Sequence, residues 1–136
     1  MKADLQALLS ALQPRRNPGV MAFVAVPAGA ADTTIAALEP IATFREGEGV
    51  TLIVEESRAR AAGLVVLLHA AWLTLDVPSG LDAVGLTAAV AGALAGAGIA
   101  CNVVAAAHHD HLFVPIARAD DALAVLRALQ ARAVNG

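Results

Sequence analysis

The fold of this chain is decided by residues 79–116, SGLDAVGLTAAVAGALAGAGIACNVVAAAHHDHLFVPI. A polar turn leads into a long run of small apolar residues, and a β-branched run, a polar cluster at His108–His111 and a second apolar run follow. Apolar residues at helical spacing that end at a glycine predict a helix, and β-branched runs predict strands. We expect a helix from near Val84 to Gly98, capped by Ser79 or Asp82, and strands over 99–106 and 112–116 joined at the polar cluster.

The segments next to this stretch extend the same pattern. Trp72–Val77 predicts a strand before the helix, and Ala122–Arg132 predicts a helix, capped by Asp120, after the last strand. The order of elements from Trp72 onward is strand, helix, strand, strand, helix. That order makes up most of a βαββαβ ferredoxin-like unit.

The first half of the chain predicts a second, looser set of strands and helices. The first expected elements are a helix at Ala3–Leu12 that ends at Pro14, a turn at Asn17–Gly19, a central strand at Val20–Val26 and a loop at Pro27–Pro40. They are followed by a hairpin of Ile41–Arg45 and Val50–Glu55, a helix at Arg58–Ala62 capped by Ser57, and a strand at Leu64–Leu68 that leads into a kink or bulge at His69–Ala71. The predicted fold class is therefore α+β, with two ferredoxin-like units in tandem and helices on one face of an antiparallel sheet.

Composition restricts the classes of function. The 136 residues are 58% hydrophobic and 15% charged, which predicts a protein that self-associates, most simply as a homodimer. A net charge of −3 and an aromatic content of 3% argue against a nucleic-acid partner. The single cysteine, Cys101, and the lack of an apolar leader pattern at the start of the sequence predict a cytoplasmic protein.

One run of residues raises the alternative of a membrane span. Ala83–Ala107 carries no formal charge and is long enough, as a helix, to cross a hydrocarbon layer of roughly 30 Å. Most of the run is Ala and Gly, Asn102 lies inside it, and the flanks are acidic or histidine-rich instead of Lys/Arg-rich. We therefore expect no membrane partner.

The cluster His108–His111 raises the alternative of a metal site, because imidazole and carboxylate groups are metal ligands. On a strand, His109 and His111 point to one face, whereas His108 and Asp110 point to the other. Two ligands on one face are too few for a closed site, so we expect no metal.

The sequence gives little support for nucleophilic catalysis or for dinucleotide binding. Cys101 lies in an apolar strand, where a thiol is usually inert, and no serine is accompanied by a convincing base. The three glycines Gly92, Gly96 and Gly98 end a helix, whereas a dinucleotide loop opens one. We therefore predict no catalytic residues and no cofactor.

The turn Ser79–Gly85 is the remaining candidate for ligand binding. A helix N-terminus exposes N–H donors that can bind a carboxylate, and Asp110 could hold an ammonium group. Together these two features match the two charges of an amino acid. An ordinary capped helix beside an ordinary hairpin is the competing interpretation.

The stretch SGLDAVGLTAAVAGALAGAGIACNVVAAAHHDHLFVP, within residues 79–117, resembles the C-terminal half of a bacterial family of small tandem ACT-domain proteins. FREGEGVTLIVEE at residues 44–56 resembles the N-terminal half of the same family. The C-terminal half is also similar, more distantly, to the ACT domains of the cytosolic arginine-sensor family. The resemblance implies an incomplete ACT-like half at residues 1–68 and an ACT domain at 69–136, or one compact unit.

The arginine-sensor pattern implies where a ligand would bind. Its contacts come from the loop before the first helix and from an Asp on the turn between the second and third strands. The matching positions here are Asp82, Ala83, Val84, Gly85, Leu86 and Asp110. Ala83 stands where the sensors carry an acidic residue, which puts arginine specificity in question.

The resulting hypothesis is a non-enzymatic ACT-type sensor that binds a small amino acid between ACT-like units. A structural or interaction module, which dimerises or docks on a partner enzyme without a ligand, is the alternative. A metal-dependent enzyme that uses His108, His109 and His111 ranks last.

Overall fold

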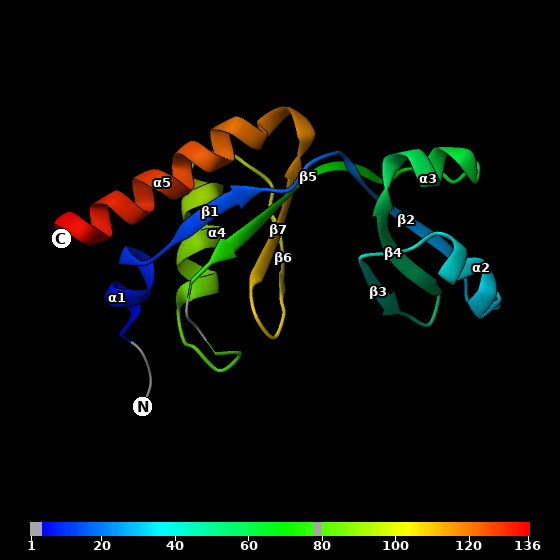
Figure 1. Cartoon of the computed structure of the whole chain (residues 1–136), viewed down its shortest axis with the longest axis horizontal. Helices are drawn as coiled ribbons and strands as arrows, with labels where there is room; N and C mark the ends of the chain where they lie inside the picture. Colours follow the sequence, from blue (N-terminus) through cyan, green and yellow to red (C-terminus); the bar gives the residue numbers. More distant parts are fainter. Residues whose placement is uncertain (1–3, 78–79) are drawn as a thin grey trace. The chain divides into compact units, whose positions relative to one another are not determined.

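The computed structural model of the chain describes residues 4–77 and 80–136. These residues form two compact units (Figure 1). Gly19–Ala70 makes up the smaller unit, and Met1–Pro18 together with Ala71–Gly136 makes up the larger unit. The N-terminal segment thus packs with the C-terminal half of the chain, while the domain division into 1–68 and 69–136 remains a prediction.

The smaller unit has a βαββαβ order of elements. They are β2 (Met21–Pro27), α2 (Asp32–Ala37), β3 (Ala42–Arg45), β4 (Gly49–Glu55), α3 (Glu56–Ala61) and the first residues of β5 (Leu68–Asp76). The strands lie in the order β3-β4-β2-β5, and the neighbours pair antiparallel. Alternate residues of β2 and β4, such as Val24 and Leu52, are fully buried against Leu38 and Ala59. The two helices therefore cover one face of these strands.

The helix α2 corrects the expected loop at Pro27–Pro40. Only Ile35 and Leu38 suggested a helical turn in the sequence, and Leu38 is indeed buried, with 7% of its surface exposed. Packing of these two side chains against the strands stabilises a helix whose periodicity is too weak to predict it. The helix supplies the element that the first half of the chain lacked for a complete unit.

Two further corrections concern the end of the smaller unit. Glu55 is the N-cap of α3, whereas Ser57 lies inside that helix. Residues 64–67 are not a strand, and β5 runs through His69–Ala71 without a kink. The hairpin of β3 and β4 and the central position of β2 are confirmed.

The larger unit repeats the βαββαβ arrangement with one strand taken from the N-terminus. Its elements are β5, α4 (Leu86–Gly96), β6 (Asn102–Ala105), β7 (Asp110–Pro115), the 3-10 turn η1 (Ile116–Arg118) and α5 (Ala119–Asn135), together with α1 (Leu5–Ser10) and β1 (Gln13–Arg16). The strands lie in the order β1-β5-β7-β6. β1 thus occupies the place of the fourth strand.

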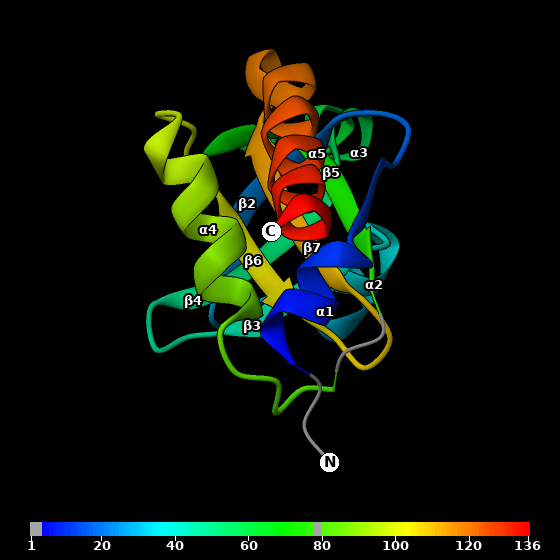
Figure 2. The same cartoon turned by 90° about the vertical axis from the view of Figure 1, so that its left-hand side faces the viewer.

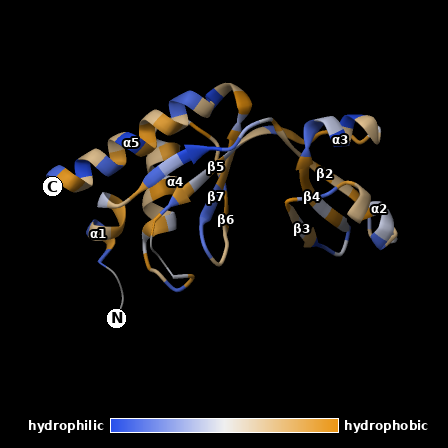
Figure 3. Cartoon of the chain, in the orientation of Figure 1, coloured by the Kyte–Doolittle hydropathy of each residue, from blue (hydrophilic) through white to orange (hydrophobic). Residues whose placement is uncertain are grey.

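The strand β1 is absent from the predictions because it has no apolar pattern. Its sequence, QPRR, is hydrophilic (Figure 3), and it contains Pro14. Proline and charged residues are typical of edge strands, where one side of the backbone has no partner. The strand pairs antiparallel with β5, Gln13 opposite Asp76 and Arg16 opposite Leu73.

The helices of the larger unit cover one face of its strands (Figure 2). The buried cluster contains Leu73 and Leu75 from β5 and Leu112 and Val114 from β7, packed against leucine and valine side chains of α1, α4 and α5. Between them in sequence, Trp72, Thr74, Asp76 and His111 project to the other face. The predicted ferredoxin-like α+β class is confirmed.

Helix ends in the larger unit differ from the predictions. The N-cap of α4 is Gly85, with no side-chain hydrogen bond to it, and Ser79 lies outside the described residues. Asp120 lies in the first turn of α5, whose N-cap is Arg118. The uncharged run 83–107 is divided between α4 and β6, and none of the described helices is both long and apolar enough to span a bilayer.

We predict that the N-terminal segment contributes to the stability of the larger unit. Leu12, which precedes β1, is only 2% exposed within the core, so Leu12→Ala should lower the free energy of unfolding by about 2–5 kcal/mol. Leu81→Ala, at a site 70% exposed, is the matched control and should change it by less than about 0.5 kcal/mol. Urea denaturation measures both. A Leu12→Ala effect as small as the control would contradict this assignment.

Candidate functional site

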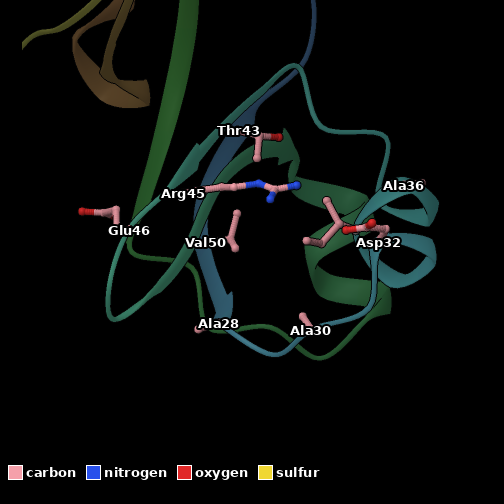
Figure 4. Close-up of a pocket in the computed structure, with 9 residues that line it drawn as sticks. Ala28, Ala30, Asp32, Ala36, Thr43, Arg45, Glu46 and Val50 are labelled. Atoms are coloured by element: carbon pink, nitrogen blue, oxygen red, sulfur yellow. The ribbon is translucent and has the colours of Figure 1, made fainter.

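A pocket of about 390 Å³ lies in the smaller unit, between the loop that precedes α2 and the β3–β4 hairpin (Figure 4). Its lining residues come from the end of β2 through α2 and from both strands of the hairpin. They are Ala28, Ala30, Asp32, Ile35, Ala36, Thr43, Arg45, Glu46 and Val50. Small apolar side chains make up most of the wall, and the polar groups belong to four residues.

Close packing of the hairpin on β2 positions one side of this pocket. Gly49 lies opposite Pro27 in the strand ladder, and a Cβ atom at Gly49 would lie 2.6 Å from the carbonyl oxygen of Val26. Only glycine fits such an approach without moving the backbone. The turn that carries Arg45 and Glu46 is therefore held against the loop at Ala28–Ala30.

The two charged groups that face the pocket have no ion-pair partner among the described residues. The side chains of Arg45 and Asp32 point toward one another from opposite sides of the pocket (Figure 4). None of the ion pairs formed by residues 4–77 and 80–136 includes either of them. Glu46 points away and accepts a hydrogen bond from Thr51 Oγ1 at 2.5 Å. Within the described parts of the chain, Arg45 and Asp32 are thus exposed, oppositely charged groups that face the pocket without an ion-pair partner.

The residues predicted to bind a ligand lie at one end of the larger unit (Figures 1 and 2). Three contacts join β5 to the β7 segment: Trp72 stacks on Phe113, Thr74 lies next to His111, and Asp76 pairs with His109. The residue numbers rise in one segment while they fall in the other, so β5 and β7 run antiparallel. The loop that follows β5 and the start of β7 therefore come to the same edge of the sheet. That edge holds residues 80–85 and Asp110.

The predicted residues differ in how accessible their side chains are. Asp82 and Val84 are exposed, Ala83 is half-buried, and Leu86 is a core residue with 2% exposure. Leu112, next to Asp110, is also fully buried in that core. Burial raises the pKa of Asp110 above its ordinary value, and the neighbouring His111 partly offsets this rise. Leu86 could offer a ligand only its backbone.

The pocket and the predicted edge occupy equivalent positions in the two units. In the smaller unit the loop before α2 and the β3–β4 turn line the pocket, and in the larger unit residues 80–85 precede α4 and Asp110 begins β7 at the corresponding places in the βαββαβ order. The pocket residues Asp32 and Arg45 were missed because residues 27–40 gave no clear helix. The signal that could have found them is the shared order of a strand, a Gly/Ala loop and a hairpin in both halves.

A second polar cluster lies on the face of the larger unit that the helices leave open. Trp72 Nε1 donates a hydrogen bond to His111 Nδ1 at 3.0 Å, and Thr74 Oγ1 lies 3.2 Å from the same nitrogen. Asn17 Nδ2 donates to Thr74 Oγ1 at 2.8 Å. His109 Nε2 lies 3.1 Å from Asp76 Oδ1, and this carboxylate also accepts from Arg15 Nε at 2.9 Å. The cluster joins three strands through satisfied polar groups.

The histidine cluster does not gather into a metal site. Among the described residues, no three His, Cys, Asp or Glu side chains are placed so that they could hold one ion. His111 is engaged by Trp72 and Thr74, and His109 is engaged by Asp76. His108 is exposed in the turn between β6 and β7. The rings of His109 and His111 lie edge to face with their centroids 6.2 Å apart, but each is held by a different partner.

Two family models, both described as ACT domain, match residues 2–70 and 68–128. The chain belongs to the ACT domain family. The two matches together cover both βαββαβ units, so the chain is a tandem of ACT domains, and the resemblance noted in the sequence is confirmed. No match was found among curated proteins.

Solved structures of several ACT-type proteins are similar to this chain. A protein of unknown function from Vibrio cholerae, described as a possible transport protein, is 43% identical, with a TM-score of 0.85 over 93% of this chain and 95% of that chain. E. coli aspartokinase III in complex with aspartate and ADP is 15% identical, with a TM-score of 0.63 over 90% of this chain and 34% of that chain. The regulatory subunit of aspartate kinase from Thermus flavus is 12% identical, with a TM-score of 0.62 over 88% and 96%. The last two likenesses concern the fold alone.

We predict that Gly85, at the start of α4 in the second ACT domain, is required for local structure. Its φ is +97°, and an added Cβ would lie 3.1 Å from Leu5 Cδ2, so Gly85→Ala should destabilise the protein by about 1–3 kcal/mol. Gly92→Ala, inside α4 with open space around it, should instead stabilise it by about 0.5–1 kcal/mol. Thermal denaturation of both variants measures the difference, and equal effects would contradict the prediction.

Proposed function

We propose that this tandem ACT protein is a non-enzymatic regulatory protein that binds a small amino acid in the pocket of its smaller unit. The observation that carries the proposal is the pair of unpaired charges, Arg45 and Asp32, that face each other across a pocket of about 390 Å³. This volume lies within the range of about 300–1,000 Å³ that is usual for small-molecule sites. An α-amino acid carries the two opposite charges that such a pocket can neutralise.

The chemistry of each group fits one end of the ligand. The planar guanidinium of Arg45 can donate two parallel hydrogen bonds to a carboxylate. The carboxylate of Asp32 can accept from an ammonium group. The remaining wall, Ala28, Ala30 and Val50 among its residues, favours a short aliphatic side chain by excluding water from it.

The equivalent edge of the larger unit is proposed as a second site. There the backbone N–H groups of Asp82–Leu86 would take the ligand's carboxylate, and Asp110 would take its amino group. The support for this second site is its equivalent topological position and the partial burial of Asp110. Leu86 would take part through its backbone, since its side chain is in the core.

The comparisons support a regulatory setting for this binding. E. coli aspartokinase III, which shares the fold over 34% of its length, was crystallised with aspartate and ADP. We propose that the present chain responds to its ligand as a cytoplasmic homodimer, without a cofactor and without nucleic acid or a membrane as partner. The ligand's occupancy would then pass to a partner protein.

An interaction module is the second candidate, and exposed apolar side chains on edge strands favour it. Phe44 on β3 is 71% exposed, and Val104 on β6 is 39% exposed. Both strands end their sheets, so their outer backbone groups are free to pair with another chain. On this interpretation the pocket would hold no ligand and the protein would act through association alone.

Isothermal titration of the folded chain against the twenty amino acids tests the proposal. At least one short aliphatic amino acid should bind, and Arg45→Gln and Asp32→Asn should each weaken it at least about tenfold, because each leaves one charge of the ligand unpaired. Arg127→Gln replaces an exposed arginine on α5 that lines neither site, so it is the matched control and should leave affinity unchanged.

The same titration separates the two sites and the two candidate functions. Asp110→Asn should halve the stoichiometry if the larger unit holds a second ligand, and should leave it unchanged if the smaller unit binds alone. No heat with any amino acid, together with a concentration-dependent dimer in sedimentation experiments, would overturn the sensor proposal in favour of the interaction module.

A further inference from the structure

The open face of the larger unit holds one histidine whose hydrogen bonds require it to be neutral. His111 Nδ1 faces two donors, the indole N–H of Trp72 at 3.0 Å and the hydroxyl of Thr74 at 3.2 Å. A donor can approach this nitrogen only while its lone pair is free, so the proton of the neutral ring must sit on Nε2. A proton on Nδ1 would face the Trp72 N–H, which cannot accept a hydrogen bond.

The same contacts lead from His111 to the end of β1. Thr74 is 1% exposed, and its hydroxyl oxygen accepts from Asn17 Nδ2 at 2.8 Å, which leaves the hydroxyl proton for His111. Asn17 also donates its backbone N–H to the carbonyl of Trp72 at 2.9 Å, and its side-chain oxygen accepts from Arg15 at 3.1 Å. Trp72 and Thr74 thus bind His111 on one side and the end of β1 on the other.

We propose that protonation of His111 loosens the pairing of β1 with β5. A protonated His111 loses both donors, so the Trp72 indole must move and the buried Thr74 hydroxyl proton loses its acceptor. A buried polar group without a partner carries the full cost of its desolvation. β1 is a hydrophilic strand at an edge. Its attachment to β5 therefore depends more on such contacts than the attachment of an apolar strand would.

Charged and titratable groups around His111 affect how readily this side chain is protonated. Within the larger unit the charged or titratable neighbours are Arg15 from β1, Asp76 from β5, His109 from the preceding turn and Asp110 on β7. Val104, its partner on β6, carries no charge. Burial, followed by His109 and Arg15, lowers the pKa of His111 below the ordinary 6.5, and Asp110 opposes this. A lowered folded-state pKa means that stability is fully present above pH 6.5 and falls as pH drops below it.

The single tryptophan provides a direct measurement. In a ¹⁵N–¹H spectrum of the full chain, the Trp72 indole signal should shift along a titration whose midpoint lies below pH 6.5. Over the same range the hydrogen-exchange protection of β1 amides, relative to those of β2, should fall by about tenfold or more. The inference does not depend on ligand binding, and no amino acid is added.

Matched variants decide the outcome. His111→Asn, which does not titrate, should abolish the indole transition and the loss of β1 protection, whereas His69→Asn in the smaller unit should leave both intact. His109→Asn should raise the midpoint, because it removes a neighbour that disfavours the charged ring, and it remains informative if His111→Asn does not fold. The proposal would be overturned if the indole transition kept its midpoint in the His111 variant or in the His109 variant. It would also be overturned if the protection of β1 amides stayed constant across the transition in the wild type.

Discussion

The strand β5 is the constraint on which the rest of the structure depends. Its nine residues pair with β2 at Leu68–Ala70 and with β1 at Leu73–Asp76. One uninterrupted strand is therefore the last of one βαββαβ order and the first of the next. Among the described residues no strand follows α5, and the N-terminal segment supplies the fourth strand of the larger unit as β1.

The alternation of side chains on β5 assigns different roles to its two faces. Leu73, Leu75 and Val77 turn toward the helices and are buried among apolar residues. Trp72, Thr74 and Asp76 turn to the other face and carry the polar network. A shift of one residue in register would exchange these two sets, which would place a carboxylate in the core. The register is thus held by both the core and the network.

The sequence predicted those elements whose apolar pattern is strong. β2, β4, β7, α4 and α5 all contain buried apolar residues at strand or helix spacing, whereas β3, which has no buried residue, follows from the glycine-containing turn that joins it to β4. The helix α2 was missed because only Leu38 of its vicinity is buried, and β1 was missed because it has no apolar residue except Pro14. Their stability comes from tertiary packing and strand pairing with distant segments, neither of which a local pattern contains.

The candidate site, too, could be predicted only in part, because local sequence patterns do not contain contacts between distant segments. The sequence pointed to a loop before a helix and a turn between strands in the larger unit, and that site remains a prediction. The pocket lies at the equivalent place in the smaller unit. The pocket in the smaller unit could not be predicted, since Asp32 and Arg45 meet only once α2 exists and Gly49 lets the hairpin approach β2. The network around His111 could not be predicted either, because its side chains come from three strands that are distant in sequence.

The two polar regions, the network on the open face and the pocket, differ in how their polar groups are engaged. On the open face, Arg15, Asn17, Trp72, Thr74 and Asp76 are each engaged by another protein group, so the effect of this region is on the structure. In the pocket, Arg45 and Asp32 face each other without pairing. Opposite charges that converge without contact leave a gap that a molecule carrying both charges can close, and its binding would replace water at both ends at once. We therefore propose that the network on the open face holds the fold, whereas the pocket, whose two exposed charges do not pair with each other, is available for recognition.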